Sequence, residues 1–344
     1  GCAQGRPLGS ATKARRIMRQ ITFPTAGRPA DVAECVDAPD PVLTSDDQLL
    51  VRVDAFPINP ADLLLFRGIY PRNPANGDAL GNEATGIVEA VGAAVPGIAP
   101  GDRVISLRTD NWRERLLLRE HELIRLSPEI GREAAAVLKV NPATALLWLE
   151  TYAALSPGDW VVQNAANSAV GRALIALAAA KGLRTVNIVR RPELADELRA
   201  LGGDHVLLDG DDLAGQATAL TGGARIGLAV DAVGGASTGR LARCLGAGGT
   251  LVAYGAMSGE PMRIDPARLV FGDLRLRGFW LTRYLAETPR ADIVALYQRL
   301  SALARTGALA PGVSARFHVL DIKAALAHAE ETMGQGKTLV SFDR

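Results

Sequence analysis

The sequence has 344 residues, enough for about two domains, and its 48% hydrophobic and 22% charged residues are typical of a globular protein. A formal net charge of +1 argues against a nucleic acid or a membrane surface as the main partner. No apolar run approaches the roughly 20 residues of a membrane-spanning helix. The widely separated Cys2, Cys35 and Cys244 do not predict a disulfide framework and favour a reducing compartment.

The first 17 residues form a tail without a predicted element. Residues 1–16 contain arginines, glycines and small polar residues but no acid, and the first residue is not methionine. We interpret residues 1–17 as an added or unstructured segment, with the remnant of a targeting sequence as the alternative. The predicted location is the cytoplasm, or the mitochondrial matrix if the tail is a targeting remnant.

Short extended runs separated by Pro, Gly and Asp follow the tail. Residues 21–23, 33–39 and 49–56 have this character, and glycines between 81 and 101 mark tight turns, so the region predicts an antiparallel barrel. The apolar stretch after Asp62 predicts one short helix, and Tyr70 lies in the following loop. By position alone, Tyr70 is more readily interpreted as a packing or surface residue than as a catalytic one.

A strand, a helix and a second strand are predicted over residues 159–191. The apolar run 160–162 enters a turn of small and polar residues (164–171), and apolar residues then recur at helical spacing until Gly182. This βαβ unit predicts a pyrophosphate site in the turn, at the start of the helix. Of the G-x-G-x-x-G fingerprint only Gly171 is present, so a βαβ unit that binds no nucleotide is the alternative.

The second strand of this unit ends in Arg190 and Arg191. An NAD site places an acid here for the ribose hydroxyls, whereas arginines suit the 2′-phosphate of NADP. The arginine pair therefore favours NADP, although paired arginines also occur on solvated faces.

Further strands are predicted within 204–209, 225–235, 248–255 and 273–281, with helical spacing between them. Six strands with crossover helices make a doubly wound α/β sheet. A long amphipathic helix is predicted after Pro289, then an extended run at 314–320, a helix from Ile322 to Met333 and a final strand at 337–342. We expect this last part to return to the barrel.

The stretches GNEATGIVEAVG (81–92) and PGDRVI (100–105) resemble the medium-chain dehydrogenase/reductase superfamily, which joins a GroES-like barrel to a Rossmann domain. This resemblance implies a GroES-like catalytic domain of residues 18–142 and 290–344, and an NADPH-binding Rossmann domain of residues 143–289. The zinc enzymes of the superfamily carry a Cys and a His ligand where this chain reads INPAD (58–62) and GNE (81–83). No zinc or other metal site is therefore predicted.

Six motifs resemble the zinc-free, mitochondrial-type trans-2-enoyl-thioester reductases of this superfamily. They are RGIYPRNPA (67–75), VNPATA (140–145), QNAANSAVG (163–171), the arginine pair after NIV, YGAM (254–257) and LRGFWL (276–281). The chain departs from the pattern at Ala169, where relatives often have glycine, and at Arg190 and Arg191, which relatives commonly separate by an acid.

The resemblance implies an NADPH-dependent reduction of an enoyl thioester on coenzyme A or acyl carrier protein. Hydride would add to the β-carbon, and Tyr70, which aligns with the family's proton donor, would stabilise and protonate the resulting enolate. The residues that align with NADP contacts are Asn141, Asn167, Ser168, Ala169, Val170, Arg190, Arg191, Tyr254, Gly255, Ala256, Met257, Phe279, Trp280, Leu281 and Lys337.

Two alternatives of other kinds stay open. An NADPH:quinone oxidoreductase, or another zinc-free alkene reductase, shares INPAD and GNE and needs no protein acid at a fixed place. A non-catalytic nucleotide-binding protein would bind NADPH without turnover. The resemblance also implies a homodimer through the sixth strand, and Arg67, Arg72, Arg283 and Arg290 are candidates for a basic patch that receives an acidic carrier.

Overall fold

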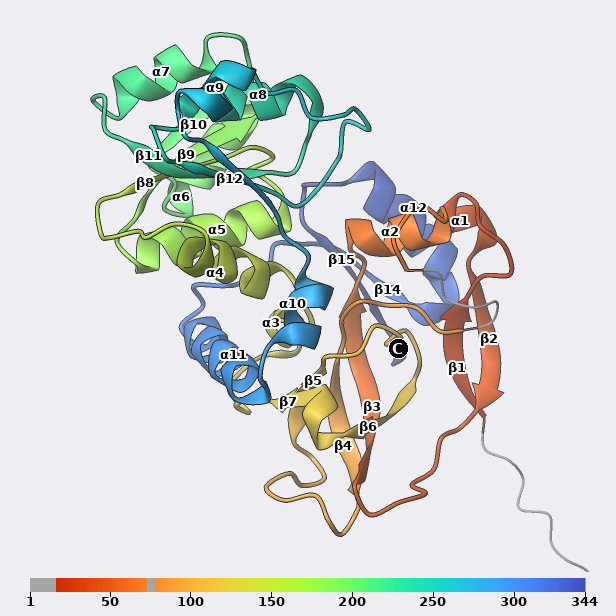
Figure 1. The fold of residues 1–344 in the computed structure, drawn as a ribbon. Coiled ribbons are helices and arrows are strands. Elements are labelled where there is room, and N and C mark those ends of the chain that lie inside the picture. The colour runs from red at the N-terminus through yellow and green to blue at the C-terminus, as the bar shows by residue number, and fades with distance from the viewer. Residues whose placement is uncertain (1–16, 73–77, 344) are drawn as a thin grey trace, which may run out of the picture.

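The computed structural model describes residues 17–72 and 78–343 and shows two bodies, a barrel and an α/β body (Figure 1). The predicted tail lies outside the described residues except for Ile17, which begins the first strand. In the barrel, β1 (Ile17–Thr22) pairs antiparallel with β2 (Glu34–Pro39), and α1 (Pro29–Val32) lies between them in sequence.

A seven-stranded sheet forms the rest of the barrel, in the order β14-β15-β3-β4-β5-β7, with β6 paired to β3. The C-terminal strand β15 runs antiparallel to β3, opposite Phe56 and Pro57, which confirms the predicted return of the chain to the first domain. The strands are β3 (Gln48–Pro57), β4 (Thr85–Val91), β5 (Arg103–Ser106), β6 (Arg115–Arg119), β7 (Leu123–Arg125), β14 (Val313–His318) and β15 (Lys337–Ser341).

The barrel core is aromatic. The rings of Phe56 and Trp112 stack with centroids 5.0 Å apart, and Phe66 lies 6.0 Å from Trp112. Gly81 has a φ of +107°, and a Cβ there would lie 2.1 Å from the Trp112 ring. Only glycine therefore lets the GNE turn pass this close to the core.

The α/β body contains a six-stranded parallel sheet in the order β10-β9-β8-β11-β12-β13, which is the predicted doubly wound arrangement. Helices α4 and α5 lie on one face, and α7, α8 and α9 lie on the other (Figure 1). The strands are β8 (Trp160–Gln163), β9 (Arg184–Val189), β10 (His205–Leu208), β11 (Ile226–Asp231), β12 (Thr250–Ala253) and β13 (Arg275–Gly278).

The helices of the α/β body lie between its successive strands, where helical spacing is predicted, except the first, which precedes the sheet. They are α4 (Asn141–Thr151), α5 (Ala169–Ala180), α6 (Ala195–Ala200), α7 (Leu213–Leu220), α8 (Gly235–Cys244) and α9 (Pro266–Val270). At the end of α5, Gly182 adopts a φ of +67°, and the N–H groups of Gly182 and Leu183 bond back to Ala179 and Ala178. This glycine-ended cap confirms the predicted helix end.

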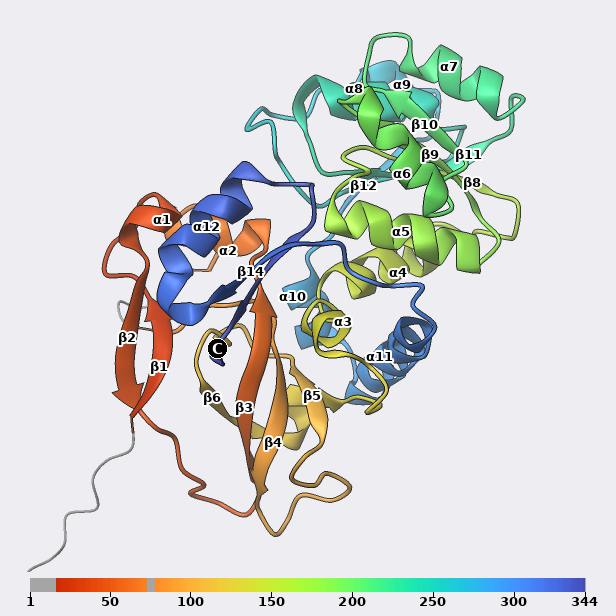
Figure 2. The same ribbon diagram turned by 180° about the vertical axis from the view of Figure 1, so that it is seen from behind.

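The largest apolar cluster joins the two bodies. Ile105 and Ile124 of the barrel pack in one cluster with α4, α5 and the long helix α11 (Arg290–Arg305), the amphipathic helix predicted after Pro289. Figure 2 shows α4 and α11 at this junction, seen from behind. The remaining helices are α2 (Pro60–Phe66), α3 (Arg132–Ala136), α10 (Leu281–Glu287), α12 (Ile322–Glu331) and the 3-10 turns η1 (Glu120–Glu122), η2 (Pro192–Leu194) and η3 (Val319–Asp321).

The strands predicted between residues 204 and 281 are shorter in the structure, most of all the fourth and the sixth. The fourth ends at Asp231 rather than Gly235, because the Asp231 carboxylate accepts the N–H groups of Val233 and Gly234 and turns the chain into α8. The sixth ends at Gly278, and α10 begins at Leu281. In residues 17–72 and 78–343, the helices are too short or too polar to cross a bilayer.

Candidate active site

The predicted phosphate turn lies at the point where the strand order reverses, between β8 and β11. Asn164, directly after β8, links this strand end to the end of β11. Its amide donates to Asp231 at 2.6 Å, and its Oδ1 accepts the N–H of Ala232 at 2.8 Å. Ser168 caps α5 by accepting the N–H of Gly171 at 3.1 Å. Ligands of doubly wound sheets bind at this reversal, where the start of a helix attracts anions.

Gly171 is required by close packing. A Cβ at this position would lie 2.5 Å from the carbonyl oxygen of Ala166, a distance that real Cβ atoms essentially never show. The turn also holds Ala165 at a φ of +47°. The helix and the turn therefore approach as closely as the sequence predicts from Gly171.

A pocket of about 220 Å³ lies at the end of β9 and contains both predicted phosphate arginines. Arg190 and Arg191 line it together with Asn167 of the phosphate turn. The opposite side comes from the C-terminal segment, with Glu331, Met333 and Gln335, and the amide of Asn167 donates to the carbonyl of Gly334 at 3.0 Å. Arg190 is exposed, so its guanidinium is accessible to an anion.

Unpaired buried polar atoms mark the neighbouring strand ends. Tyr254 follows β12, and its buried hydroxyl faces Ser168 of the phosphate turn but makes no hydrogen bond within 3.5 Å in the described residues. The side-chain amide nitrogen of Asn141, at the start of α4, likewise has no hydrogen-bond partner in the described residues. Buried polar groups cost free energy unless a partner satisfies them, so these two groups fit a bound polar ligand such as a dinucleotide.

The other predicted contacts are placed around these strand ends. Phe279 packs edge-on against Trp148 with centroids 6.0 Å apart, and Leu281 is buried. Gly255, Ala256 and Met257 are exposed in the loop after β12, and Ala169 and Val170 form the first turn of α5.

Tyr70 lies in the loop after α2. Asn59 and Asp62 cap this helix reciprocally, and the N–H of Asn59 donates to Asp62 Oδ2 at 2.8 Å. The hydroxyl of Tyr70 accepts a hydrogen bond from Trp280 Nε1 at 2.8 Å, and the two rings are edge-on with centroids 6.1 Å apart. Trp280 follows β13, so the two bodies meet at the predicted acid.

Burial raises the pKa of Tyr70 above its ordinary value of 10, although the hydrogen bond from Trp280 opposes the rise. The nearby Asp62 carboxylate acts in the same direction as burial. The hydroxyl therefore stays protonated at neutral pH, the state that a proton donor requires.

Beside Tyr70 lies a buried polar cluster that the sequence reasoning missed as a unit. The side-chain amide of Asn59 donates to Glu83 at 2.8 Å, and the backbone N–H and amide of Asn82 donate to Asp62 at 3.0 and 2.7 Å. Two lysines complete this buried polar cluster, defined as Asn59, Asp62, Asn82, Glu83, Lys139 and Lys337. The stretches INPAD and GNE, which contain the two Asn residues and the two acids of the cluster, were the sequence signal that could have predicted it.

Both lysines of the buried polar cluster make specific contacts. Lys337 Nζ donates to Asn59, and its side chain is buried at 6% exposure. The predicted contact of Lys337 with NADPH stays a prediction. Lys139 Nζ donates to the carbonyl oxygens of Asn82 and Arg108. Burial lowers the pKa of Lys139 to about 8, and the nearby Glu83 carboxylate opposes this shift.

The buried polar cluster also fixes the chain segment between the two bodies. The N–H of Val140 donates to Glu83 at 3.0 Å, and the hydroxyl of Tyr297 donates to the carbonyl of Lys139 at 2.9 Å. Asn141, a predicted cofactor contact, follows directly. The cluster therefore positions the start of α4 relative to α2, the helix that precedes the loop of Tyr70.

The four arginines considered for a basic patch have different partners. Arg67 is paired with Glu330, and Arg290 donates to the carbonyl oxygens of residues 120 and 123. The Arg283 guanidinium lies 5.9 Å from the centre of the Trp280 ring, and Arg72 donates to Thr109. Arg72 and Arg283 are therefore the two that flank the pair of Tyr70 and Trp280.

Other kinds of site find little support. The segment 235–239 fits the G-x-S-x-G pattern of hydrolase nucleophiles, but Ser237 is buried in α8, where it donates to Asp209 at 3.0 Å. In the part of the chain that the structure describes, no group of three or more His, Cys, Asp or Glu side chains is placed to hold a metal ion.

The site and fold together define a two-domain, nucleotide-dependent oxidoreductase. Residues 45–121 match the family model of the alcohol dehydrogenase GroES-like domain, and residues 169–299 match that of the zinc-binding dehydrogenases. The mitochondrial enoyl-[acyl-carrier-protein] reductase of Homo sapiens is 37% identical, over 92% of this chain and 86% of that protein. The Caenorhabditis elegans protein of the same name is 36% identical, over 87% and 88%. The chain belongs to the medium-chain dehydrogenase/reductase family that includes these enoyl reductases.

Solved structures agree with the fold. A complex of Etr1p with NADP and crotonyl-CoA superposes with a TM-score of 0.86, at 23% identity, covering 95% of this chain and all of that one. A mycobacterial quinone oxidoreductase superposes with a TM-score of 0.83, at 27% identity, covering 94% and 99%. The expected pairing of a Rossmann sheet with a GroES-like barrel is confirmed.

Proposed function

We propose that this protein uses NADPH to reduce the α,β double bond of a trans-2-enoyl thioester carried by coenzyme A or acyl carrier protein. The observation that carries the proposal is the hydroxyl of Tyr70, held by Trp280 Nε1 at 2.8 Å where the barrel meets the strand ends of the α/β sheet. The names of the curated relatives and the NADP and crotonyl-CoA complex of Etr1p support the same substrate class.

The residues present fit NADPH. Arg190 and Arg191 would pair with its 2′-phosphate, the N-terminus of α5 would receive the pyrophosphate, and the unpaired groups of Asn141 and Tyr254 would bond to its polar atoms. Bound NADPH supplies the hydride that adds to the β-carbon.

The chain itself supplies the acid. Addition of hydride at the β-carbon places negative charge on the thioester oxygen, and the protonated Tyr70 hydroxyl would donate a hydrogen bond to it and deliver a proton to the α-carbon, directly or by way of a water. Trp280 occupies one lone pair of that hydroxyl and orients its proton. Burial of the site strengthens these interactions because water competes for them less.

An NADPH:quinone oxidoreductase is the second candidate, since the superposed mycobacterial enzyme is named for that activity. NADPH oxidation is measured with crotonyl-CoA and separately with a quinone, and the thioester product is identified by mass spectrometry. Formation of butyryl-CoA at a rate well above quinone reduction supports the proposal. Turnover of the quinone alone would favour the second candidate, and NADPH binding without turnover would favour the non-catalytic alternative.

A homodimer through β13 is part of the proposal. All four residues of this edge strand are exposed, and the neighbouring α9 exposes Val270 at 70% and the following Phe271 at 86%. Unpaired strand edges and apolar patches of this kind favour association. A related Candida tropicalis reductase is described as a heterodimer, which supports pairing but not its symmetry. Light scattering of wild type and Phe271→Glu tests it: a dimer that becomes monomeric is expected.

The cellular location is also proposed rather than established. The sequence favours the cytoplasm, with the mitochondrial matrix as the alternative. The names of the curated relatives describe mitochondrial proteins, which supports the alternative. Immunodetection after fractionation of the native cells separates the two.

A further inference from the structure

A second pocket, of about 340 Å³, lies beside the loop that carries Tyr70. We name it the arginine pocket, and its described lining consists of Arg72, Asp78, Ala79, Asp110 and Arg113. None of these residues is used in the chemistry proposed above.

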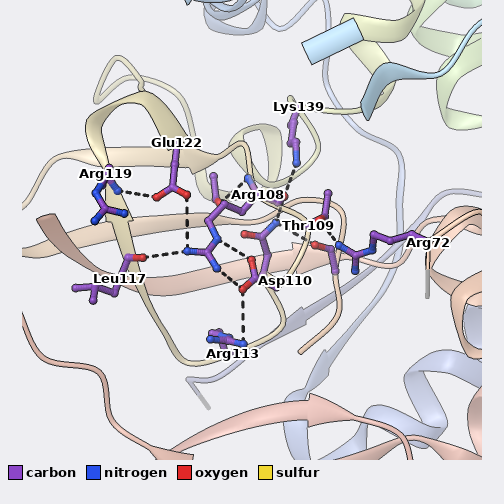
Figure 3. Close-up of polar contacts among 12 residues, drawn as sticks. Arg72, Arg108, Thr109, Asp110, Arg113, Leu117, Arg119, Glu122 and Lys139 are labelled. Atoms are coloured by element: carbon purple, nitrogen blue, oxygen red, sulfur yellow. Dashed lines mark hydrogen bonds and ion pairs between the residues drawn. The ribbon is translucent and has the colours of Figure 1, made fainter. Parts of the chain in front are cut away.

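Arg72 is fixed at the wall of the arginine pocket by one hydrogen bond. Its Nη1 donates to the hydroxyl of Thr109 (Figure 3). The loop of Thr109 is in turn held by Lys139, whose Nζ donates to the carbonyl of Arg108 at 2.6 Å. Lys139, a member of the buried polar cluster, therefore helps to position Arg72 indirectly, through the loop that contains Arg108 and Thr109.

The arginine pocket is lined by two arginines and two carboxylates, those of Asp78 and Asp110. Arg108 grips Asp110 with two parallel bonds, Nε to Oδ1 at 2.8 Å and Nη2 to Oδ2 at 2.5 Å (Figure 3). Arg113 approaches the same carboxylate only to 3.6 Å. Among the described residues, no carboxylate oxygen lies within 4.0 Å of the Arg72 guanidinium, so Arg72 forms no ion pair there.

Three guanidinium nitrogens of the arginine pocket lack an acceptor. The Nε and Nη2 of Arg72 and the Nε of Arg113 are shielded from water and have no hydrogen-bond partner in the described part of the chain. Desolvated donors on charged groups cost more than neutral ones. An entering oxyanion would satisfy them, and the fork of an arginine matches the two oxygens of a carboxylate or phosphate.

The arginine pocket is close to the predicted chemistry. The backbone N–H of Arg72 donates to the carbonyl of Tyr70 at 2.8 Å. Burial is the main cause of the raised pKa of Tyr70, and the Arg72 charge is among the groups that oppose it. An anion at Arg72 would therefore lie near the reacting thioester.

We propose that the arginine pocket binds an oxyanion of the thioester substrate, with Arg72 as the principal contact and Arg113 as the second. This inference rests on the proposed enoyl-thioester reductase activity. The oxyanion has two sources in such substrates, a phosphate of the pantetheine carrier or a carboxylate at the far end of the acyl group.

The test compares three substrates for wild type, Arg72→Met and Arg113→Met. Crotonyl-CoA carries phosphates, S-crotonyl-N-acetylcysteamine is neutral, and S-glutaconyl-N-acetylcysteamine carries only an acyl carboxylate. We expect Arg72→Met to lower kcat/KM at least tenfold for one anionic substrate, mainly through KM, and to leave the neutral thioester within twofold. Loss on crotonyl-CoA identifies the phosphate, and loss on the glutaconyl thioester identifies the carboxylate.

Controls separate recognition from folding and from failure of the proposed function. Arg72→Lys, which keeps the charge, should recover part of the loss, and Arg67→Met, on the same segment but paired with Glu330, should change none of the three substrates. Equal losses on all three substrates, or no loss on any, would overturn the proposal. Wild type that reduces no thioester at all, including the neutral one, would instead refute the activity on which it rests.

Discussion

Replacing the buried Lys139 by Met should change how stability depends on pH. Lys139 is 3% exposed, and burial lowers its pKa from 10.5 to about 8 in the folded protein. The unfolded chain keeps the ordinary value, so between pH 8 and 10.5 it holds a proton that the folded protein has released. The Lys139 contribution to the free energy of unfolding therefore rises with pH across this window.

The size of the change in unfolding free energy follows from the fall in the pKa of Lys139. Each pKa unit corresponds to about 1.36 kcal/mol, so the fall from 10.5 to about 8 gives at most about 3 kcal/mol. At pH 7 the lysine carries its charge in both states, and Lys139→Met destabilises the protein there, because the carbonyls of Asn82 and Arg108 lose their donor.

Urea unfolding at pH 7, 8, 9 and 10 measures this prediction. The difference in unfolding free energy, wild type minus Lys139→Met, should be constant below pH 8 and then grow by about 1 kcal/mol per pH unit. The exposed Lys323 gives a matched control, and Lys323→Met should show a constant difference throughout. A Lys139 difference that stays flat or falls above pH 8 would refute the reasoning.

Three further predictions concern the cofactor side of the site. Alanine at both Arg190 and Arg191 should raise the Kd for NADPH about a hundredfold and that for NADH less than threefold, measured by fluorescence titration, since only NADPH carries the 2′-phosphate; equal weakening would contradict the assignment. Gly171→Ala should lower Tm and NADPH affinity, because the new Cβ meets the carbonyl of the preceding turn, whereas Gly131→Ala, where nothing lies within 4 Å, should change neither. Trp280→Phe should fold and bind NADPH but lose about 2- to 10-fold in kcat with the lost hydrogen bond, while Trp280→Ala should also lower stability and cofactor binding.

Local patterns were sufficient to predict the six strands of the α/β sheet and their doubly wound arrangement. Apart from the edge strand β13, the strands are short and largely apolar runs between turn residues. A parallel sheet with crossover helices follows from the alternation of such strands with helices. The return of β15 to the barrel was also predicted, because KTLVSF has strand character after a helix. Strand ends were less predictable, since Asp231 ends β11 through a side-chain bond to its own turn.

The contacts that complete the site depend on residues far apart in sequence. Tyr70 and Trp280 are separated by 210 positions, and the sequence gives no sign that one would donate to the other. Gln335 lines the pocket that contains Arg190 and Arg191 only because the C-terminal segment folds back past Asn167. A resemblance could suggest each predicted residue singly, but only the folded chain brings these three-dimensional partners together.

Buried charge was the hardest feature to foresee. Lys139 follows an apolar run and looks like an ordinary solvated lysine at the end of a helix, yet its ammonium is bonded to two backbone carbonyls. Glu83 similarly follows a turn and is completely buried. Burial of a charged side chain depends on partners from several segments, and no local periodicity encodes it.

The most direct test of the account is the rate of NADPH-dependent crotonyl-CoA reduction by wild type and Tyr70→Phe. The substitution removes only the hydroxyl, so folding and NADPH affinity should be retained while kcat falls about a hundredfold or more. Such a loss would establish the enoyl reductase reaction and the role of Tyr70 together. Full activity of Tyr70→Phe on crotonyl-CoA would contradict the central claim.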